Sequence, residues 1–126
     1  MKKSYNLIPG ERIENVELVN TIKQLISTVD IKDWIVLDED SYLSYLSYFN
    51  NCYVLYLDPK GIIIRLYKVE YKELSSFLKN NFSPVYGYGI DIAVCPLSID
   101  NAVIFNHDGE AFLLRALLNY SDHQPN

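Results

Sequence analysis

Hydrophobic residues recur at helical spacing in three segments of the chain. Between residues 14 and 28 the apolar positions follow a period of about 3.6 residues and glutamates precede them, which predicts a helix over residues 13–28. The segment SYLSYLSYF, residues 41–49, repeats one triplet. Because a three-residue step falls about 60° short of a helical turn, its tyrosines and its leucines form two slanting rows. Residues 70–81 show helical spacing as well, so the pattern predicts three helices.

The repeated triplet fits a helix better than a strand. In a strand, successive tyrosines would point to opposite faces and serines would be buried beside leucines. In a helix, the leucines face the core and the tyrosines lie at the boundary with water. We expect Asp38 or Asp40 to cap this helix and the asparagine pair at residues 50–51 to end it.

Two runs rich in β-branched and aromatic residues predict a β-hairpin in the middle of the chain. Residues 52–58 and 61–69 flank the sequence DPKG, in which proline presets a type I turn and glycine accepts a left-handed conformation. We expect Ile62, Ile64 and Leu66 to face the core. The nearly unbroken apolar run before the turn indicates an interior strand.

Further strands are predicted on either side of this hairpin. Residues 34–37 form a short apolar run bounded by aspartates, and residues 90–96 form another run closed by a proline. A second hairpin is expected from residues 102–105 and 111–115, which flank an NHDG turn. Since residues 110–118 are also rich in helix formers, this segment is either a strand or a terminal helix.

The order of these elements and the composition indicate one α+β domain. The chain has 126 residues, of which 49% are hydrophobic and 21% charged, which suits a single folded domain. Hairpins dominate over βαβ units, so we predict a mainly antiparallel sheet of about five strands with helices packed on one face. The domain is expected over residues 1–118, followed by a flexible tail over residues 119–126.

The net charge and the cysteines limit the kinds of partner and the cellular compartment that we expect for the protein. A net charge of −5 disfavours binding to nucleic acids and to anionic membranes, and it favours basic proteins as partners. The first residues lack the apolar run of a secretory signal, and no apolar run reaches the roughly 20 residues that span a bilayer. Cys52 and Cys95 are isolated, as is typical of reduced core cysteines. We therefore expect a cytoplasmic protein.

No motif in the sequence specifies a reaction, a metal or a cofactor. His107 and Asp108 lie in a predicted turn that by itself explains these residue types, and neighbours on a turn usually point apart. The histidines and cysteines lack the spacing of metal ligands. Residues 86–89, YGYG, precede a predicted strand and not the helix that a dinucleotide-binding loop needs. We predict that the protein is not an enzyme; a nucleophile pair of Cys95 or Cys52 with His107 is the alternative.

Five carboxylates fall within residues 30–40 and directly precede the tyrosine row. A charge run of this kind usually forms a solvated loop with helix caps. Tyrosine, however, combines a large contact area, few rotatable bonds and a polar tip, which suits it to binding surfaces. We therefore interpret the segment as a docking surface for a basic protein. Its predicted partner-binding residues are Asp33, Asp38, Glu39, Asp40, Tyr42, Tyr45 and Tyr48.

The segment VIFNHDGEAFLL, residues 103–114, resembles bacterial toxin-immunity proteins, including those of contact-dependent growth inhibition systems, and the region of Trp34 adds to the likeness. The resemblance implies a cytoplasmic protein that neutralises one cognate polymorphic toxin, often a basic nuclease, by covering its active site or another essential surface. It transfers no binding residue. Two alternatives stand beside it. One is an adaptor or homo-oligomeric module that uses a strand edge or the tyrosine helix, and the other is a small-molecule enzyme that uses Cys95 or His107.

Overall fold

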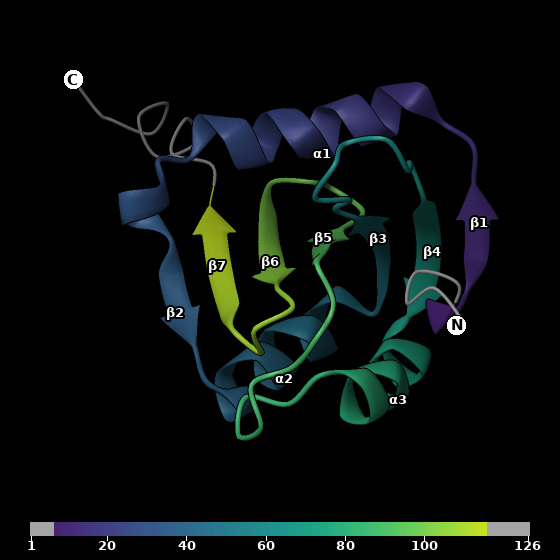
Figure 1. Ribbon diagram of the computed structural model, residues 1–126. Helices are drawn as coiled ribbons and strands as arrows, with labels where there is room; N and C mark the ends of the chain where they lie inside the picture. The colour runs from purple at the N-terminus through teal and green to yellow at the C-terminus, as the bar shows by residue number, and fades with distance from the viewer. Residues whose placement is uncertain (1–6, 116–126) are drawn as a thin grey trace.

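The computed structural model describes residues 7–115, and Figure 1 shows their arrangement. One antiparallel sheet of seven strands carries three α-helices and a short 3₁₀ helix, η2. In chain order the elements are β1 (Glu11–Ile13), α1 (Val16–Thr28), η2 (Ile31–Asp33), β2 (Ile35–Leu37), α2 (Glu39–Phe49), β3 (Asn51–Tyr56), β4 (Leu66–Glu70), α3 (Tyr71–Asn81), β5 (Ile92–Pro96), β6 (Asn101–Phe105) and β7 (Ala111–Arg115). Within this part of the chain, none of the helices has the length and apolar character needed to cross a membrane.

The strands follow the order β1-β4-β3-β5-β6-β7-β2, and every neighbouring pair is antiparallel. The prediction of an α+β fold with an antiparallel sheet is confirmed, whereas the predicted number of about five strands is too low. The six segments predicted as strands correspond to β2–β7, and the strand that no predicted segment covers is β1, which is only three residues long. So short a strand leaves no alternation of polar and apolar residues to recognise. The other edge strand, β2, has the same length.

The helices cover both faces of the sheet, and the prediction that they pack on one face is wrong. Successive residues of a strand point to opposite faces. In β3, Val54 packs in the core formed with α2 and α3, whereas Leu55 packs in the core formed with α1. In β5 the neighbours Val94 and Ala93 are divided between the two cores in the same way. Burial on both faces explains why these strands read as unbroken apolar runs.

The three predicted helices are confirmed, with shifted ends. α1 begins three residues later than predicted, because residues 11–13 pair with β4 as β1. Asp38 caps α2 by accepting a hydrogen bond from the Ser41 amide at 2.9 Å. After α2 the chain turns at Asn50, which has a positive φ of 65°. The residues that cap α2 and end it are therefore among those that the sequence predicts for these roles.

The hairpin of β3 and β4 is confirmed, but its strands are shorter than predicted because a nine-residue loop, 57–65, separates them. The carboxylate of Asp58 accepts hydrogen bonds from three backbone N–H groups of this loop, at 3.1, 2.9 and 2.7 Å. These amides belong to Lys60, Ile62 and Ile63. The loop leaves Ile62 and Ile64 exposed, contrary to the prediction, whereas Leu66 is buried as predicted.

The second hairpin is confirmed by β6 and β7, in which Phe105 pairs with Ala111. Residues 111–115 form a strand and not a helix, which decides between the two alternatives for this part of the segment. Residues 116–118, and the predicted tail over residues 119–126, lie outside the described residues.

Candidate protein-binding surface

Three acidic segments meet at one end of the sheet: the start of α2, the loop before β5 and the turn between β6 and β7. Leu37 in β2 pairs with Ala111 in β7. Asp38 follows the first of these partners and Glu110 precedes the second, so both lie at the same end of the antiparallel pair. The loop before β5 contacts the same turn. The pairing of the strands thus brings together carboxylates that are far apart in the sequence.

At the start of α2, the predicted partner-binding residues Asp38, Glu39 and Asp40 are exposed to solvent. The hydrogen bond from the Ser41 amide lowers the pKa of Asp38, so this carboxylate keeps its charge at lower pH than usual. Asp33 does not belong to this group, because it lies in η2 at the other end of β2. The start of α2 therefore contributes three of the four predicted acids to one surface.

Tyr42 is a core residue, and the prediction that it lies at the boundary with water is wrong. Its side chain is 2% exposed. The ring packs edge-on against Phe82 and Phe105, with ring centroids 5.6 and 5.1 Å away, and burial raises the pKa of the Tyr42 hydroxyl to about 12. Tyr42 therefore offers no contact area to a partner. It holds α2 against β6 and the end of α3.

The other two tyrosines of the row face different surroundings. Tyr45 is half-buried, and its hydroxyl accepts a hydrogen bond from Arg115 on β7. Tyr48 is 84% exposed and lies near the opposite end of α2 from its acidic start. Because each three-residue step turns back by about 60°, two steps rotate the row by about 120° around the helix. One end of the row therefore enters the core while the other end reaches solvent.

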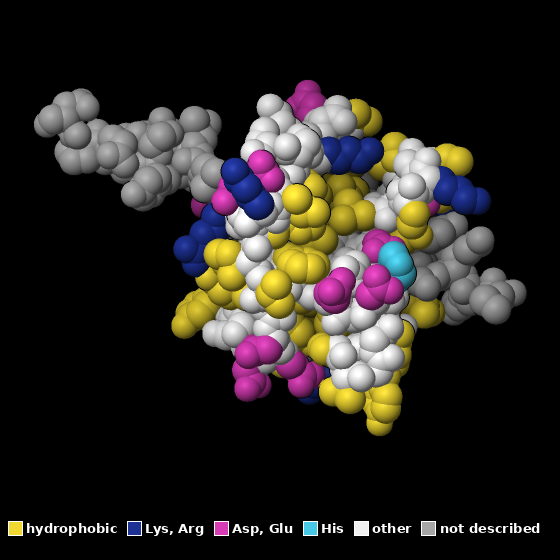
Figure 2. All heavy atoms as spheres, turned by 60° about the vertical axis from the view of Figure 1, so that its left-hand side comes forward, with side chains coloured by type: hydrophobic (Ala, Val, Ile, Leu, Met, Phe, Trp, Pro, Cys, Tyr) yellow, Lys and Arg dark blue, Asp and Glu magenta, His cyan; other side chains and the backbone are white. Residues whose placement is uncertain are grey.

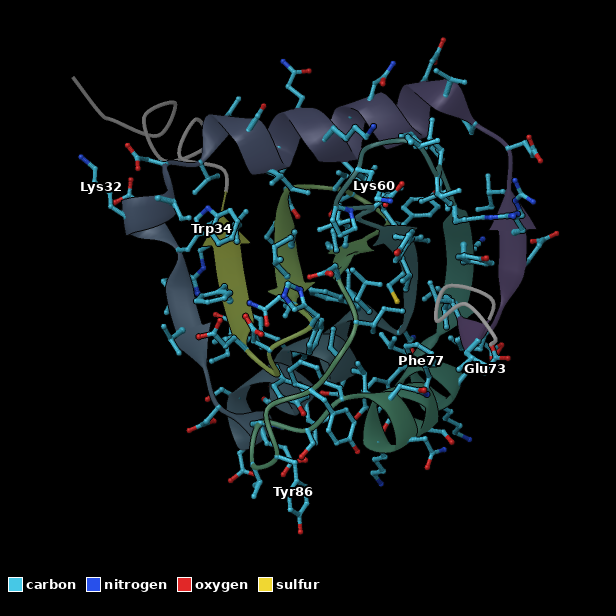
Figure 3. All side chains as sticks on the ribbon, viewed as in Figure 1. Lys32, Trp34, Lys60, Glu73, Phe77 and Tyr86 are labelled. Atoms are coloured by element: carbon cyan, nitrogen blue, oxygen red, sulfur yellow. The ribbon has the colours of Figure 1, made fainter. Side chains whose placement is uncertain are left out.

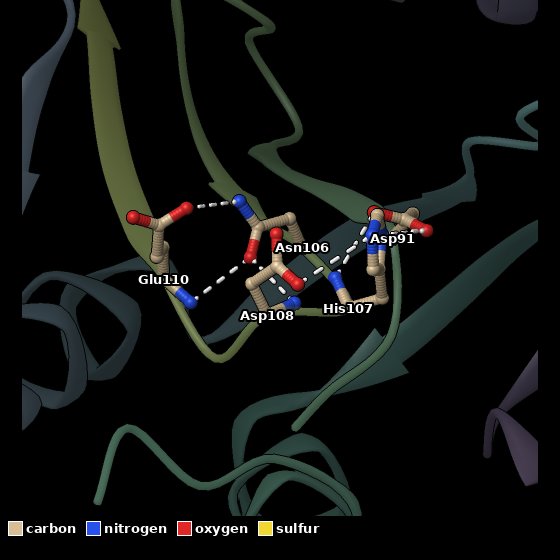
Figure 4. A network of polar contacts seen from close by, with 5 residues as sticks. All are labelled: Asp91, Asn106, His107, Asp108 and Glu110. Carbon is tan, nitrogen blue, oxygen red and sulfur yellow. Dashed lines mark hydrogen bonds and ion pairs between the residues drawn. The ribbon is translucent and has the colours of Figure 1, made fainter. Parts of the chain in front are cut away.

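The turn between β6 and β7 is organised by Asn106, as Figure 4 shows. Its side-chain oxygen accepts hydrogen bonds from the amides of Asp108 and Glu110, both at 3.0 Å. Its side-chain nitrogen donates to the Glu110 carboxylate at 2.9 Å. Bonds of this kind between asparagine and nearby amides are typical of tight turns. They hold the carboxylates of Asp108 and Glu110 on an ordered turn.

His107 faces a carboxylate through each of its ring nitrogens (Figure 4). Nδ1 lies 3.1 Å from Asp91 and Nε2 lies 3.6 Å from Asp108, so the two neighbours do not point apart as expected. The hydrogen bond to Asp91, together with the negative charges of Asp91 and Asp108, raises the pKa of His107. A general base needs a free ring nitrogen that can take a proton. The geometry instead favours an imidazolium that balances the carboxylates around it.

The two cysteines lie on neighbouring strands, but their side chains point to opposite faces of the sheet and neither meets this histidine. Cys52 packs in the core with α2 and α3, and Cys95 packs in the core with α1, on the opposite face of the sheet. Burial raises the pKa of each thiol to about 12. Cys95 is four residues along the chain from Asp91, roughly 13 Å in a strand, so it does not meet His107. Among residues 7–115, no group of three or more histidine, cysteine, aspartate or glutamate side chains is placed to hold a metal ion.

The loop between α3 and β5 presents an aromatic tip beside the acidic turn. Tyr86 is 83% exposed, its neighbour Val85 is similarly exposed, and Figure 3 shows Tyr86 pointing away from the body of the molecule. Ser83 closes the loop from behind, since its carbonyl accepts hydrogen bonds from the amides of Gly87 and Tyr88 at 2.9 and 3.2 Å. The exposed side chains therefore stand on a closed, hydrogen-bonded loop.

Glycine lets this loop and the β6–β7 turn approach each other closely. Gly109 has a φ of 81°, and a Cβ at this position would lie 2.5 Å from the carbonyl oxygen of Ser83. A Cβ at Gly89 would lie 2.5 Å from the carbonyl oxygen of Asn106. Neither distance is compatible with a side chain, so both contacts depend on glycine. The aromatic loop and the acidic turn thus form one continuous surface.

We call this surface the acidic end. Its residues are Asp38, Glu39, Asp40, Val85, Tyr86, Tyr88, Asp91, Asp108 and Glu110. Sequence reasoning found the three acids of α2 but missed the rest, because loop and turn meet only in the folded chain. The alternation of tyrosine and glycine in YGYG was the one local signal for an aromatic loop. Comparisons with protein-family models, with curated proteins and with solved structures found no match.

Proposed function

We propose that the protein is an immunity protein that binds and neutralises a cognate bacterial toxin through the acidic end. The observation that carries this proposal is the convergence of carboxylates from three segments beside the exposed ring of Tyr86. Carboxylates at the rim of an interface steer a basic partner toward it and penalise acidic ones. An exposed tyrosine adds the contact area that charge alone does not provide.

The order of the aromatic loop supports binding rather than a merely solvated surface. Ordering a loop on association costs free energy, roughly 0.5–1.5 kcal/mol for each immobilised side chain. Here the backbone under Tyr86 is already held by Ser83 and by the close approach to Gly109. Binding a partner therefore costs less free energy for ordering this loop than it would for an unconstrained loop.

The resemblance to toxin-immunity proteins points to the same place. Residues 103–114, which carry it, form the β6–β7 hairpin, and the turn of this hairpin contributes Asp108 and Glu110 to the acidic end. On this proposal the protein acts in the cytoplasm, and its partner is a basic toxin domain, for example a nuclease. Lysines and arginines of the toxin would pair with the carboxylates, and the bound immunity protein would cover an essential surface of the toxin.

Charge reversal with a matched control tests the proposal. The probe is the C-terminal domain encoded by the adjacent upstream reading frame, which this proposal expects to be the toxin, and Kd is measured by isothermal titration calorimetry. Glu39→Lys with Asp40→Lys should weaken binding at least tenfold, about 1.4 kcal/mol. Glu11→Lys with Glu14→Lys makes the same change in net charge at the opposite edge of the sheet and should change Kd less than threefold.

The outcomes separate three situations. Equal weakening by both double variants would mean that only the net charge matters, and the acidic end would not be the interface. Unchanged Kd in both would remove this surface from consideration. Absence of any binding by the natural chain, together with absence of protection in cells that express the toxin domain, would contradict the immunity function itself.

A further inference from the structure

The strand β2 forms one edge of the sheet and has an open side. It pairs with β7 through Ile35, Val36 and Leu37, and no described residue pairs with its outer side. Ile35 is 49% exposed and Val36 is 74% exposed. Since successive residues point to opposite faces, these two side chains leave apolar surface on both sides of the edge. An exposed apolar edge strand is a template for pairing with another chain.

The two edges of the sheet differ in this respect. The opposite edge, β1, exposes Glu11 and Arg12, and charged side chains on an edge strand discourage pairing. β2 carries no charged residue within the strand. Figure 2, which views the side of the molecule that carries β2, shows hydrophobic side chains between groups of acidic ones. Apolar side chains are thus exposed at the centre of this side, with acidic groups on both sides of them.

Charges on both flanks of β2 indicate which chain can pair with it. The flank before the strand holds Asp30, Lys32 and Asp33, with a net charge of −1. The flank after it holds Asp38, Glu39 and Asp40, with a net charge of −3. If the β2 strands of two copies paired in antiparallel orientation, the −1 flank of each would lie beside the −3 flank of the other. In parallel orientation, −1 would lie beside −1 and −3 beside −3. Both arrangements bring negative flanks together. Like charges brought together in this way oppose self-pairing.

We propose that β2 binds an extended segment of the toxin as an additional strand, with an apolar centre and lysine or arginine at both ends. This inference rests on the proposed function and specifies how the partner binds. Main-chain hydrogen bonds to a sheet edge supply affinity in such complexes, and side chains at alternate positions supply specificity. The added strand would run directly into the acidic end, because Asp38 joins β2 to α2.

A lysine placed on the edge tests the inference against a matched control. Val36→Lys puts a charge on the open edge, whereas Val16→Lys puts the same charge on α1 at a residue that is equally exposed, 74% in both cases. With the same toxin domain as the probe, Val36→Lys should weaken binding at least tenfold and Val16→Lys less than threefold. Thermal unfolding should show that both variants remain folded, because neither side chain is buried, with a small loss of stability for Val16→Lys because lysine is unfavourable in the first turn of α1.

Hydrogen exchange gives a direct readout of strand addition. In the complex, exchange should slow at least tenfold at those amides of residues 35–37 that point away from β7, while exchange in residues 11–13 of the other edge strand stays unchanged. Binding that Val36→Lys does not affect, with no added protection of residues 35–37, would overturn the inference and leave the proposed function standing. A concentration-dependent dimer of the natural chain that Val36→Lys abolishes would show that a second copy occupies the edge, which would overturn the inference as well.

Discussion

Asp91 and His107 are sixteen residues apart in the chain, and they are joined twice. One carboxylate oxygen of Asp91 accepts a hydrogen bond from the His107 amide at 3.1 Å and lies at the same distance from its Nδ1. The amide contact does not depend on protonation of the ring, whereas the ring contact gains the attraction of a full positive charge when the imidazole is protonated. The pair therefore connects the turn between β6 and β7 to the loop before β5 through one contact that is independent of the charge of the ring and one that is strengthened by it.

The raised pKa of His107 predicts a pH-dependent contribution to stability. A histidine whose pKa is higher in the folded state than in the unfolded state stabilises the fold fully below the unfolded pKa, about 6.5. This stabilisation is lost as the pH rises through the folded pKa. Urea unfolding should therefore show a larger difference between the natural chain and His107→Gln at pH 5.5 than at pH 9. An NMR titration that places the pKa of His107 at or below 6.5 would contradict the prediction.

Tyr42 and Tyr48 offer a comparison of the same residue type on one helix. Tyr42→Ala should lower the free energy of unfolding by about 3–5 kcal/mol, because it removes a ring that is packed against Phe82 and Phe105. Tyr48→Ala should change it by less than about 0.5 kcal/mol, since that side chain is exposed. Urea denaturation followed by circular dichroism measures both values. Similar values for the two variants would contradict the assignment of Tyr42 to the core.

Substitutions at Gly109 and Gly61 can distinguish the cost of a steric clash with neighbouring residues from the cost of a strained backbone conformation. Both have positive φ, 81° and 70°, but only Gly109 has neighbours where a Cβ would lie. Gly61→Ala should cost about 1–2 kcal/mol through the left-handed conformation alone. Gly109→Ala should cost at least about 1 kcal/mol more, because the chain at Ser83 must also move. Equal losses of unfolding free energy would mean that the loop and the turn do not pack as described.

The two thiols should be unreactive in the folded protein. Cys52 and Cys95 are buried and their pKa values are raised to about 12, so almost no thiolate exists near neutral pH. A colourimetric disulfide reagent at pH 8 should label neither cysteine within minutes, and it should label both once urea unfolds the chain. Rapid labelling of Cys95 in the folded protein would favour the alternative in which this residue acts as a nucleophile.

Features of the fold that depend on local chemistry could be predicted from the sequence. The helix cap at Asp38, the stop at Asn50 and the turn before Gly109 all depend on residues within a few positions. Ile62 and Ile64 were placed wrongly, because a β-branched run predicts a strand whether or not its amides are free. In this loop the Asp58 carboxylate accepts hydrogen bonds from the amides of Ile62 and Ile63, so these amides do not pair with a neighbouring strand. The pattern of apolar residues does not reveal a side chain that competes for the backbone amides.

Most of the acidic end could not be predicted, because its parts meet only through the sheet. The register that aligns Leu37 with Ala111 depends on which strands become neighbours, and one sequence does not fix that order. Helix geometry by itself implies that the tyrosine row is slanted, so that one of its ends is buried. Which end is buried depends on the position of Phe82 and Phe105, which the sequence does not give. The unbroken apolar runs did contain the signal for helices on both faces.

On the proposed function, the loop that carries Val85 and Tyr86 separates the side chains that contact a partner from the residues that hold the fold. Its shape is set from behind, by Ser83 and by the glycine contact with the turn, while the two exposed side chains contribute little to the interior. Substitutions at these two positions should therefore be tolerated without loss of the fold. If the proposed function holds, substitution of a few outward side chains during evolution would change which toxin is bound, while the buried scaffold is inherited unaltered.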